Sequence, residues 1–207
     1  MEVSEETPLG WRERKKRQTR EALSWAVIRL SVERGWGNVT VEDAAAAAGV
    51  SERTFRNYFA SKAEAVAARH RDRMLRIAAE LRSCPPGEPL WAAITSAVVS
   101  QFGGGEPQSR AWNDAIQLMV TEPDVAGEFL KANAAAQGDL AAAIAGRTGT
   151  DPARDLYPTL VAAAITAATT TAMDHWLRAD PPVALEGLMR EAFGQLQAGL
   201  PAPARED

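Results

Sequence analysis

Five polar side chains between residues 51 and 57 have the types and spacing that recognition of a nucleic acid requires. Arg53 and Arg56 each offer a guanidinium that can bond two acceptors of one guanine, and the Asn57 amide matches the edge of adenine. The hydroxyls of Ser51 and Thr54 suit phosphates or base edges. The pattern favours a DNA-reading surface, and the competing interpretation is a helical hairpin in a bundle with its charges in solvent.

Two short helical runs, joined by the sequence AGVS, must position these side chains. Thr40 caps the first run, and Asp43 three residues later resembles a capping box. Gly49 permits a tight turn, and Ser51 caps a second run over residues 52–58. This arrangement predicts a helix-turn-helix whose second helix enters the major groove.

The residues that follow extend the same surface. The Tyr58 hydroxyl can bond a phosphate while its ring braces the helix. Ser61 caps a further helix, and Lys62 adds its charge to the positive N-terminal end of that helix. Phe55 and Phe59 are expected to face a three-helix core.

Charge is unevenly distributed along the chain. The net charge is -4, but residues 1–82 carry 16 basic and 12 acidic side chains, whereas residues 83–207 carry 7 and 15. The asymmetry suggests that only the first half approaches phosphate. A leader from Arg12 to Arg20 holds six basic residues and one acid. It could follow the phosphate backbone, reach into the minor groove, or be a frayed and solvated helix start.

Helical periodicity without strand alternation runs through the whole chain, which predicts an all-α fold of about nine helices. Leu23, Ala26, Val27 and Leu30 illustrate the pattern as one stripe of the first helix, which Gly35 should end. The expected helices cover about residues 12–34, 40–48, 52–58, 61–82, 90–102, 112–120, 125–145, 152–178 and 182–199.

The composition of the chain indicates the cellular compartment in which the protein is expected to act. The chain has 207 residues, is 46% hydrophobic and contains a single cysteine, Cys84, so no internal disulfide can form. No run of about 18 apolar residues is present, and the acidic N-terminus lacks the apolar stretch of a signal peptide. We therefore expect a cytoplasmic protein with no membrane partner.

Catalytic patterns are weak in this sequence. The two histidines, His70 and His175, are far apart, and Cys84 lies in a proline-rich break without a nearby base. There is no glycine-rich phosphate loop and no pair of metal-ligand motifs. We expect no enzyme, no cofactor and no metal. The alternatives are a helical module that binds a small molecule or protein without DNA, or an enzyme that uses a helical pocket.

The segment TVEDAAAAAGVSERTFRNYFASKAEA resembles the signature of TetR-type bacterial transcription regulators. The match extends over residues 20–65, and in that family the third helix reads the operator. The resemblance implies that residues such as Thr40, Tyr58 and Lys62 hold phosphates. The predicted DNA-binding residues are Thr40, Ser51, Arg53, Thr54, Arg56, Asn57, Tyr58 and Lys62.

Three positions depart from the family pattern. Ala44 stands where isoleucine is usual, Ser31 replaces an aromatic residue, and Arg56 also occupies a place where an aromatic is common. Arg56 adds a donor at the groove and could change the operator that is read. The sequences RTFRNYF and RERKKRQTR are similar to the regulators of mycofactocin-type systems, some of which answer to acyl-CoA.

The resemblance weakens after about residue 82, where it implies a helical ligand-binding and dimerisation domain. The expected organisation is a disordered N-terminus (1–10), a helix-turn-helix DNA-binding domain (11–62), a ligand-binding and dimerisation domain (63–200) and a disordered tail (201–207). A homodimer would pair the last two helices, with close approach at Ala163, Ala164, Ala167 and Ala168.

A pocket for a small-molecule effector is expected among the helices of residues 89–178, although large aromatics more often fill a core. Few basic residues lie there, which favours an apolar or aromatic effector and conflicts with the phosphates of acyl-CoA. We expect a ligand-responsive regulator, by family default a repressor, that a small molecule releases from a pseudo-palindromic operator. The candidate ligand-binding residues are Trp91, Phe102, Trp112, Met119, Phe129, Asn133, Thr169, His175 and Trp176.

Overall fold

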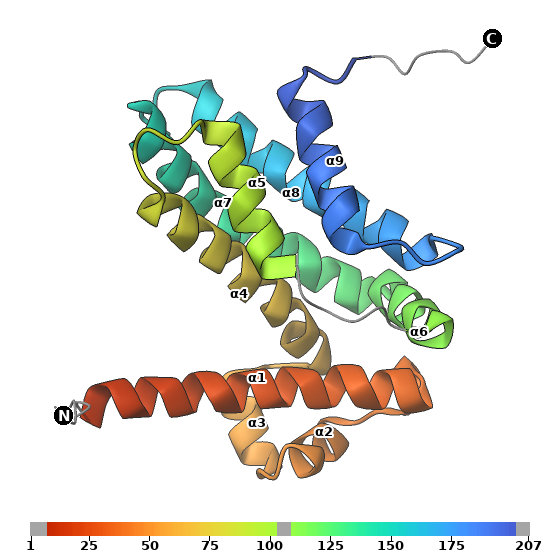
Figure 1. The fold of residues 1–207 in the computed structure, drawn as a ribbon. Helices are drawn as coiled ribbons and strands as arrows, with labels where there is room; N and C mark the ends of the chain where they lie inside the picture. Colours follow the sequence, from red (N-terminus) through yellow and green to blue (C-terminus); the bar gives the residue numbers. More distant parts are fainter. Residues whose placement is uncertain (1–7, 103–108, 202–207) are drawn as a thin grey trace, which may run out of the picture. The chain divides into compact units, whose positions relative to one another are not determined.

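The computed structural model describes residues 8–102 and 109–201. These ranges contain nine α-helices, one short 3-10 turn and no strand, which confirms the predicted all-α fold (Figure 1). The elements are α1 (Pro8–Arg34), η1 (Trp36–Asn38), α2 (Val41–Ala47), α3 (Glu52–Tyr58), α4 (Lys62–Ser83), α5 (Leu90–Phe102), α6 (Arg110–Thr121), α7 (Pro123–Thr148), α8 (Leu156–Arg178) and α9 (Leu185–Gln197).

The chain divides into two compact units. Unit 1 comprises Met1–Arg69 and Leu118–Glu128, and unit 2 comprises His70–Gln117 and Phe129–Asp207. Helices α4, α6 and α7 each pass from one unit to the other within their own length. Of the termini predicted to be disordered, residues 1–7 and 202–207 lie outside the described part of the chain.

Unit 1 is built around helices α1, α2 and α3, which pack on one another in chain order. Leu23 and Val27 of α1 are fully buried, and so are Ala44 of α2 and Phe55 and Phe59 at α3. The two phenylalanine rings meet at 5.7 Å between centroids with an interplanar angle of 60°. Both phenylalanines therefore lie in the core, as the sequence predicts. The tilted ring contact adds to their burial in fixing α3.

Unit 2 buries one face of each of its longer helices. Its core contains Met74 and Leu81 of α4, Ile94 of α5, Leu140 of α7 and Phe193 of α9, all fully buried. Helix α9 packs against both α8 and α5 (Figure 1). Met189 and Phe193 of α9 are fully buried, so the apolar side of this helix faces the core.

One arginine of α7 forms hydrogen bonds to the proline-rich segment that connects α4 and α5. The Arg147 guanidinium donates to the carbonyls of Cys84 at 3.0 Å, Pro85 at 3.2 Å and Glu88 at 2.7 Å. A fourth, longer contact of 3.4 Å reaches the carbonyl of Leu81, in the last turn of α4. These bonds give donors to carbonyls of the helix end and the turn; among these, the Pro85 carbonyl also accepts from the Glu88 N–H at 3.1 Å.

Three helices begin three or more residues away from the predicted start. Helix α1 begins at Pro8 rather than Arg12, since proline is well suited to a first helical turn. Helix α8 begins at Leu156 rather than residue 152, because Asp155 accepts from the Asp151 N–H at 2.8 Å and holds a turn there. Helix α9 begins at Leu185, after the pair Pro181–Pro182.

Candidate functional site

The turn between α2 and α3 has the tight geometry expected of a helix-turn-helix. Gly49 adopts a left-handed φ of +70°, and its N–H donates to the Ala46 carbonyl at 3.0 Å. The Val50 N–H donates back to the Ala45 carbonyl at 3.0 Å. These two bonds end α2 and turn the chain within four residues, because only glycine adopts this φ without strain.

Helix α3 starts at a serine cap and presents its polar side chains on the face opposite Phe55. The Ser51 hydroxyl accepts from the Thr54 N–H at 3.2 Å and lies 2.9 Å from the Thr54 hydroxyl. Arg53 and Asn57 are exposed, whereas Phe55 is fully buried. The structure thus brings the predicted base-reading side chains to one accessible surface of a seven-residue helix.

Arg56 is exposed but bonded to a neighbour that the sequence reasoning missed. Its Nε donates to Glu52 Oε1 at 2.6 Å, and a terminal nitrogen lies 2.5 Å from the same oxygen. The spacing of four residues was the available signal. Arg56 must therefore share its guanidinium with this carboxylate when it approaches a base, and Glu52 itself can accept from cytosine.

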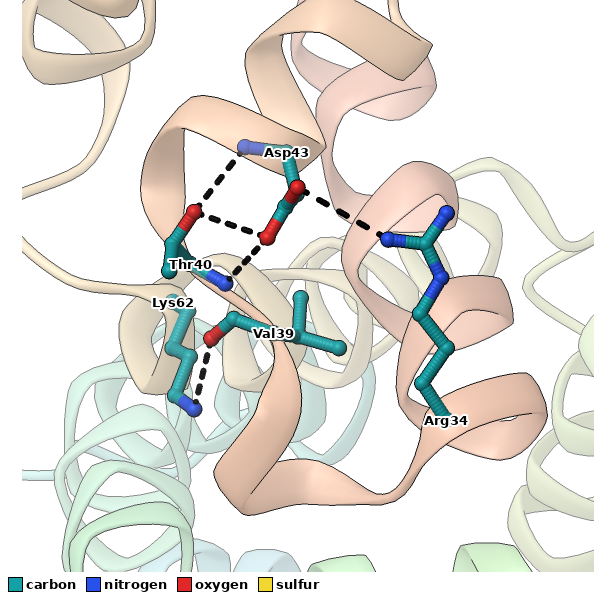
Figure 2. Close-up of polar contacts among 5 residues, drawn as sticks. All are labelled: Arg34, Val39, Thr40, Asp43 and Lys62. Carbon is teal, nitrogen blue, oxygen red and sulfur yellow. Dashed lines mark hydrogen bonds and ion pairs between the residues drawn. The ribbon is translucent and has the colours of Figure 1, made fainter.

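The entrance to α2 is held by a closed set of polar contacts (Figure 2). The Thr40 N–H and hydroxyl donate to Asp43 Oδ2 at 2.9 and 2.8 Å, and the Asp43 N–H donates to Thr40 Oγ1 at 3.1 Å. Arg34 lies 3.7 Å from the other carboxylate oxygen. These bonds lower the pKa of Asp43, with the Thr40 N–H as the largest cause. The predicted capping box is confirmed, and the hydroxyl expected to meet phosphate is already engaged in it.

Lys62 also has intramolecular partners. Its ammonium donates to the Val39 carbonyl at 3.0 Å (Figure 2). It also donates to the Trp36 carbonyl at 2.5 Å and lies 4.1 Å from the centroid of the Trp36 ring. Partial burial lowers the pKa of Lys62, and the charges of Asp124 and Glu122 oppose that shift. Lys62, at the start of α4, therefore holds η1 and the extended residue Val39 that follows it. Tyr58, the last residue of α3, is half-buried.

The candidate ligand-binding residues differ in their burial and in the unit to which they belong. Trp91, Trp112 and Trp176 are half-buried on three different helices, and His175 is exposed. Met119 is buried but belongs to unit 1, whereas the other eight belong to unit 2.

Phe129 and Asn133 are brought together by a residue that the sequence reasoning set aside, His70 of α4. Its Nε2 lies 2.6 Å from Asn133 Oδ1, and its ring lies 5.3 Å from that of Phe129. Burial lowers the pKa of His70, while the bond to Asn133 opposes the shift. Phe102 is covered by the guanidinium of Arg73, 4.2 Å from its centroid. Contacts between separate helices leave no spacing signal, so these pairs could not be found from the sequence.

The buried side-chain atoms of unit 2 that lack a hydrogen-bond partner include the Thr169 hydroxyl on α8 and Asn113 Oδ1 on α6. Thr169 was a candidate ligand contact, but Asn113 was not. A groove of about 520 Å³ lies between α5 and α9, and none of the nine candidates lines it; its walls are Ala92, Thr95, Ser96, Val99, Ser100, Arg190, Gly194 and Gln197.

Within residues 8–102 and 109–201, no group of three or more histidine, cysteine or acidic side chains is arranged to hold a metal ion. One helix in the same ranges, α8, is long and apolar enough to span a membrane by length and composition, and about a third of its most apolar stretch is buried.

Comparison with protein families gives two matches along the chain. Residues 26–68 match the family model described as bacterial regulatory proteins of the tetR family. Residues 88–201, more than half of the chain, match the model described as the MftR C-terminal domain.

Individual relatives agree with these families. The transcriptional regulator TcmR of Streptomyces glaucescens is 33% identical over 180 residues, which cover 83% of this chain and 79% of the relative. The putative mycofactocin biosynthesis regulator MftR of Mycobacterium tuberculosis is 25% identical over 187 residues, covering 90% and 93%. The solved structure of Thermus thermophilus FadR with lauroyl-CoA shares the fold, with a TM-score of 0.52, 20% identity, and coverage of 91% and 100%. With its helix-turn-helix and these matches along both halves, the chain belongs to the TetR family of bacterial transcription regulators, which bind DNA.

Proposed function

We propose that this regulator binds a pseudo-palindromic operator as a homodimer and is released from it by a small, largely apolar effector. The observation that carries the proposal is the exposed face of α3, where Arg53 and Asn57 project opposite the buried Phe55. In a dimer, two such helices would enter successive major grooves about 34–36 Å apart. Repression is proposed because a bound dimer blocks a promoter, and the protein acts in the cytoplasm, where its DNA lies.

The proposed division of labour follows the chain. Residues 11–62 would bind DNA, and residues 63–200 would bind the effector and the second subunit. The proposed phosphate contacts are Thr40, Tyr58 and Lys62. Each can bind a phosphate only through an N–H or O–H group that its hydrogen bonds within the chain do not use. The hydroxyl of Tyr58 and one N–H of Lys62 meet that condition more readily than Thr40 does.

The proposal of a homodimer through α8 and α9 rests on the outer face of α8. Leu156 and Leu160 are 76% and 58% exposed, and Ala163 and Ala167 are also exposed one and two turns further on. Spacings of four and three residues place all four on one stripe. A second copy would cover this stripe, and the small alanines would allow close approach. Burial on two faces, by the core and by a partner, also accounts for the apolar composition of α8.

An apolar effector is favoured over acyl-CoA by the charges of unit 2. A ligand with several phosphates needs guanidinium or ammonium groups that remain available to it. Seven arginines of unit 2 already donate to, or pair with, groups of this chain: Arg76, Arg82, Arg110, Arg147, Arg154, Arg178 and Arg190. Thermal unfolding with lauroyl-CoA, lauric acid or neutral aromatic compounds tests this; a shift with the CoA ester alone would contradict it.

The effector can release DNA only if it binds the conformation of the dimer that does not bind DNA more tightly than the conformation that does. Helix α4 is the proposed transmitter, because it begins beside the helix-turn-helix at Lys62 and continues into the core of unit 2 at Met74 and Leu81. A movement of unit 2 around the effector would therefore change the position of Lys62 and the loop it braces.

The function is tested by binding to the region upstream of the protein's own gene. A mobility-shift titration with that fragment, followed by footprinting, should show two protected half-sites about one helical turn apart. Failure of the effector-free dimer to bind any promoter fragment would contradict DNA binding by this chain and would favour a helical module that binds only a ligand or protein.

A further inference from the structure

The N-terminal part of α1 forms a charged extension beyond the packed helices of unit 1. Residues 11–20, named here the basic leader, are helical and mostly exposed, whereas the first fully buried residue of α1 is Leu23. Figure 1 shows this red end of α1 running past α3. Because the leader is a continuation of a packed helix, its charges are held in a defined direction rather than on a frayed chain.

Four of the six basic residues of the leader share one half of the helix surface. Arg12, Lys16 and Arg20 are spaced by four residues and form a stripe, and Arg17 lies on the same half of the helix. Glu13, the one acidic residue of the leader, lies on this half too, and the half keeps a positive balance. Successive members of this stripe lie about 6 Å apart along the axis.

A contact at the base of the leader fixes which way this stripe faces. The Arg20 guanidinium lies 4.6 Å from the centroid of the Phe59 ring, and Phe59 is the residue that ends α3. The side of α1 that carries Arg20 therefore faces the end of the recognition helix. Arg12 and Lys16 share that side and lie further out, beyond α3.

The helical state of the leader also decides between its possible DNA contacts. An α-helix with side chains is about 10–12 Å wide, and the minor groove of B-DNA is about 6 Å wide. The leader therefore cannot insert into the minor groove as it stands. Phosphates along the backbone remain, and long basic side chains on one stripe suit them.

We infer that the basic leader is a second DNA contact, in which Arg12, Lys16 and Arg17 bind phosphates of the duplex flanking the half-site that α3 reads. The inference rests on the proposed function. Ten helical residues span about 15 Å, which corresponds to about four base pairs of one strand. The leader should thus lengthen the footprint and steepen the salt dependence without changing which sequence is preferred.

The matched variants Lys16→Ala and Lys15→Ala test this inference, because they remove the same charge from adjacent residues. Lys16 lies on the stripe, while Lys15 lies on another side of α1, 5.1 Å from the centroid of the Trp11 ring. The measurement is the slope of log affinity against log salt for the upstream fragment. Lys16→Ala should lower the slope by about 1.8, since a dimer loses two phosphate contacts, and Lys15→Ala should change it little. Equal effects would overturn the inference in favour of diffuse attraction.

A second measurement separates the leader from folding and from the function itself. In a duplex that carries the two half-sites, removing about four base pairs outside each half-site should lower the salt slope of the wild type but not that of Arg12→Ala/Lys16→Ala. Circular dichroism verifies that the variant folds, and its preference for operator over random duplex should be unchanged. If the wild type binds and trimming has no effect, the inference alone fails; if the wild type binds no DNA, the proposed function fails as well.

Discussion

Gly49 is the residue on which the geometry of the reading surface depends most. Its left-handed φ of +70° turns the chain from α2 into α3, and open space surrounds the position where a Cβ would lie. A larger side chain would therefore meet no neighbour, and any cost of substitution comes from the backbone alone.

Gly49→Ala should lower the free energy of unfolding by about 1–2 kcal/mol, the cost of placing an L-residue in the left-handed region. Gly37→Ala is the matched control, because Gly37 lacks a positive φ and also has open space at its Cβ. Urea denaturation of the two variants measures the difference. Equal stabilities would contradict the strained-turn explanation.

Asp43 gives the fold a contribution that depends on pH. Its pKa is lowered from the usual 3.8 by bonds from the Thr40 N–H and hydroxyl. A lowered folded-state pKa means that the cap stabilises the fold above pH 3.8 and that this stabilisation is lost as the pH falls through the folded-state value. Asp43→Asn should make unfolding less sensitive to acid in that range, because the asparagine side chain does not ionise. Stability curves from pH 2 to pH 7 provide the measurement.

At the scale of elements, the sequence predicts a structural feature well where that feature depends on one residue and its near neighbours in the chain. The caps at Thr40 and Ser51, the turn at Gly49 and the burial of Phe55 all follow from short-range rules. The nine α-helices within residues 8–102 and 109–201 follow from periodicity.

Contacts between elements could not be read from the sequence, because they depend on which helices become neighbours. The pair of His70 with Asn133 and the two carbonyls bound by Lys62 join residues that are 23 to 63 positions apart. The ligand candidates were chosen by residue type alone, and type does not distinguish a pocket wall from a core. Their roles therefore stay predictions.

The turn between α4 and α5 is stabilised by one side chain, that of Arg147. Arg147→Met should cost about 2–4 kcal/mol of unfolding free energy, because several carbonyls of that turn lose their donors. Arg154→Met, at an exposed arginine that pairs with Asp151 in the preceding turn, should change stability by less than about 0.5 kcal/mol. Thermal unfolding in parallel measures both, and similar losses would contradict the bracing role of Arg147.

At the scale of the whole molecule, assembly determines whether two reading helices can act together. Leu160→Glu should dissociate the proposed homodimer, because it places a charge on the exposed stripe of α8. Leu130→Glu is the control, since Leu130 is also exposed, at 71%, but lies on α7. Sedimentation velocity should find monomers for the first variant and dimers for the second. Dimers in both cases would place the interface elsewhere.

The central claim, that α3 reads the operator, is tested most directly by the affinity of Arg53→Ala for the upstream fragment. Fluorescence anisotropy at fixed salt should show a loss of about 1–3 kcal/mol and weaker discrimination at one base pair of each half-site. Arg154→Ala removes the same exposed charge from unit 2 and should bind like the wild type. Wild-type affinity and unchanged base preference in Arg53→Ala would contradict the account.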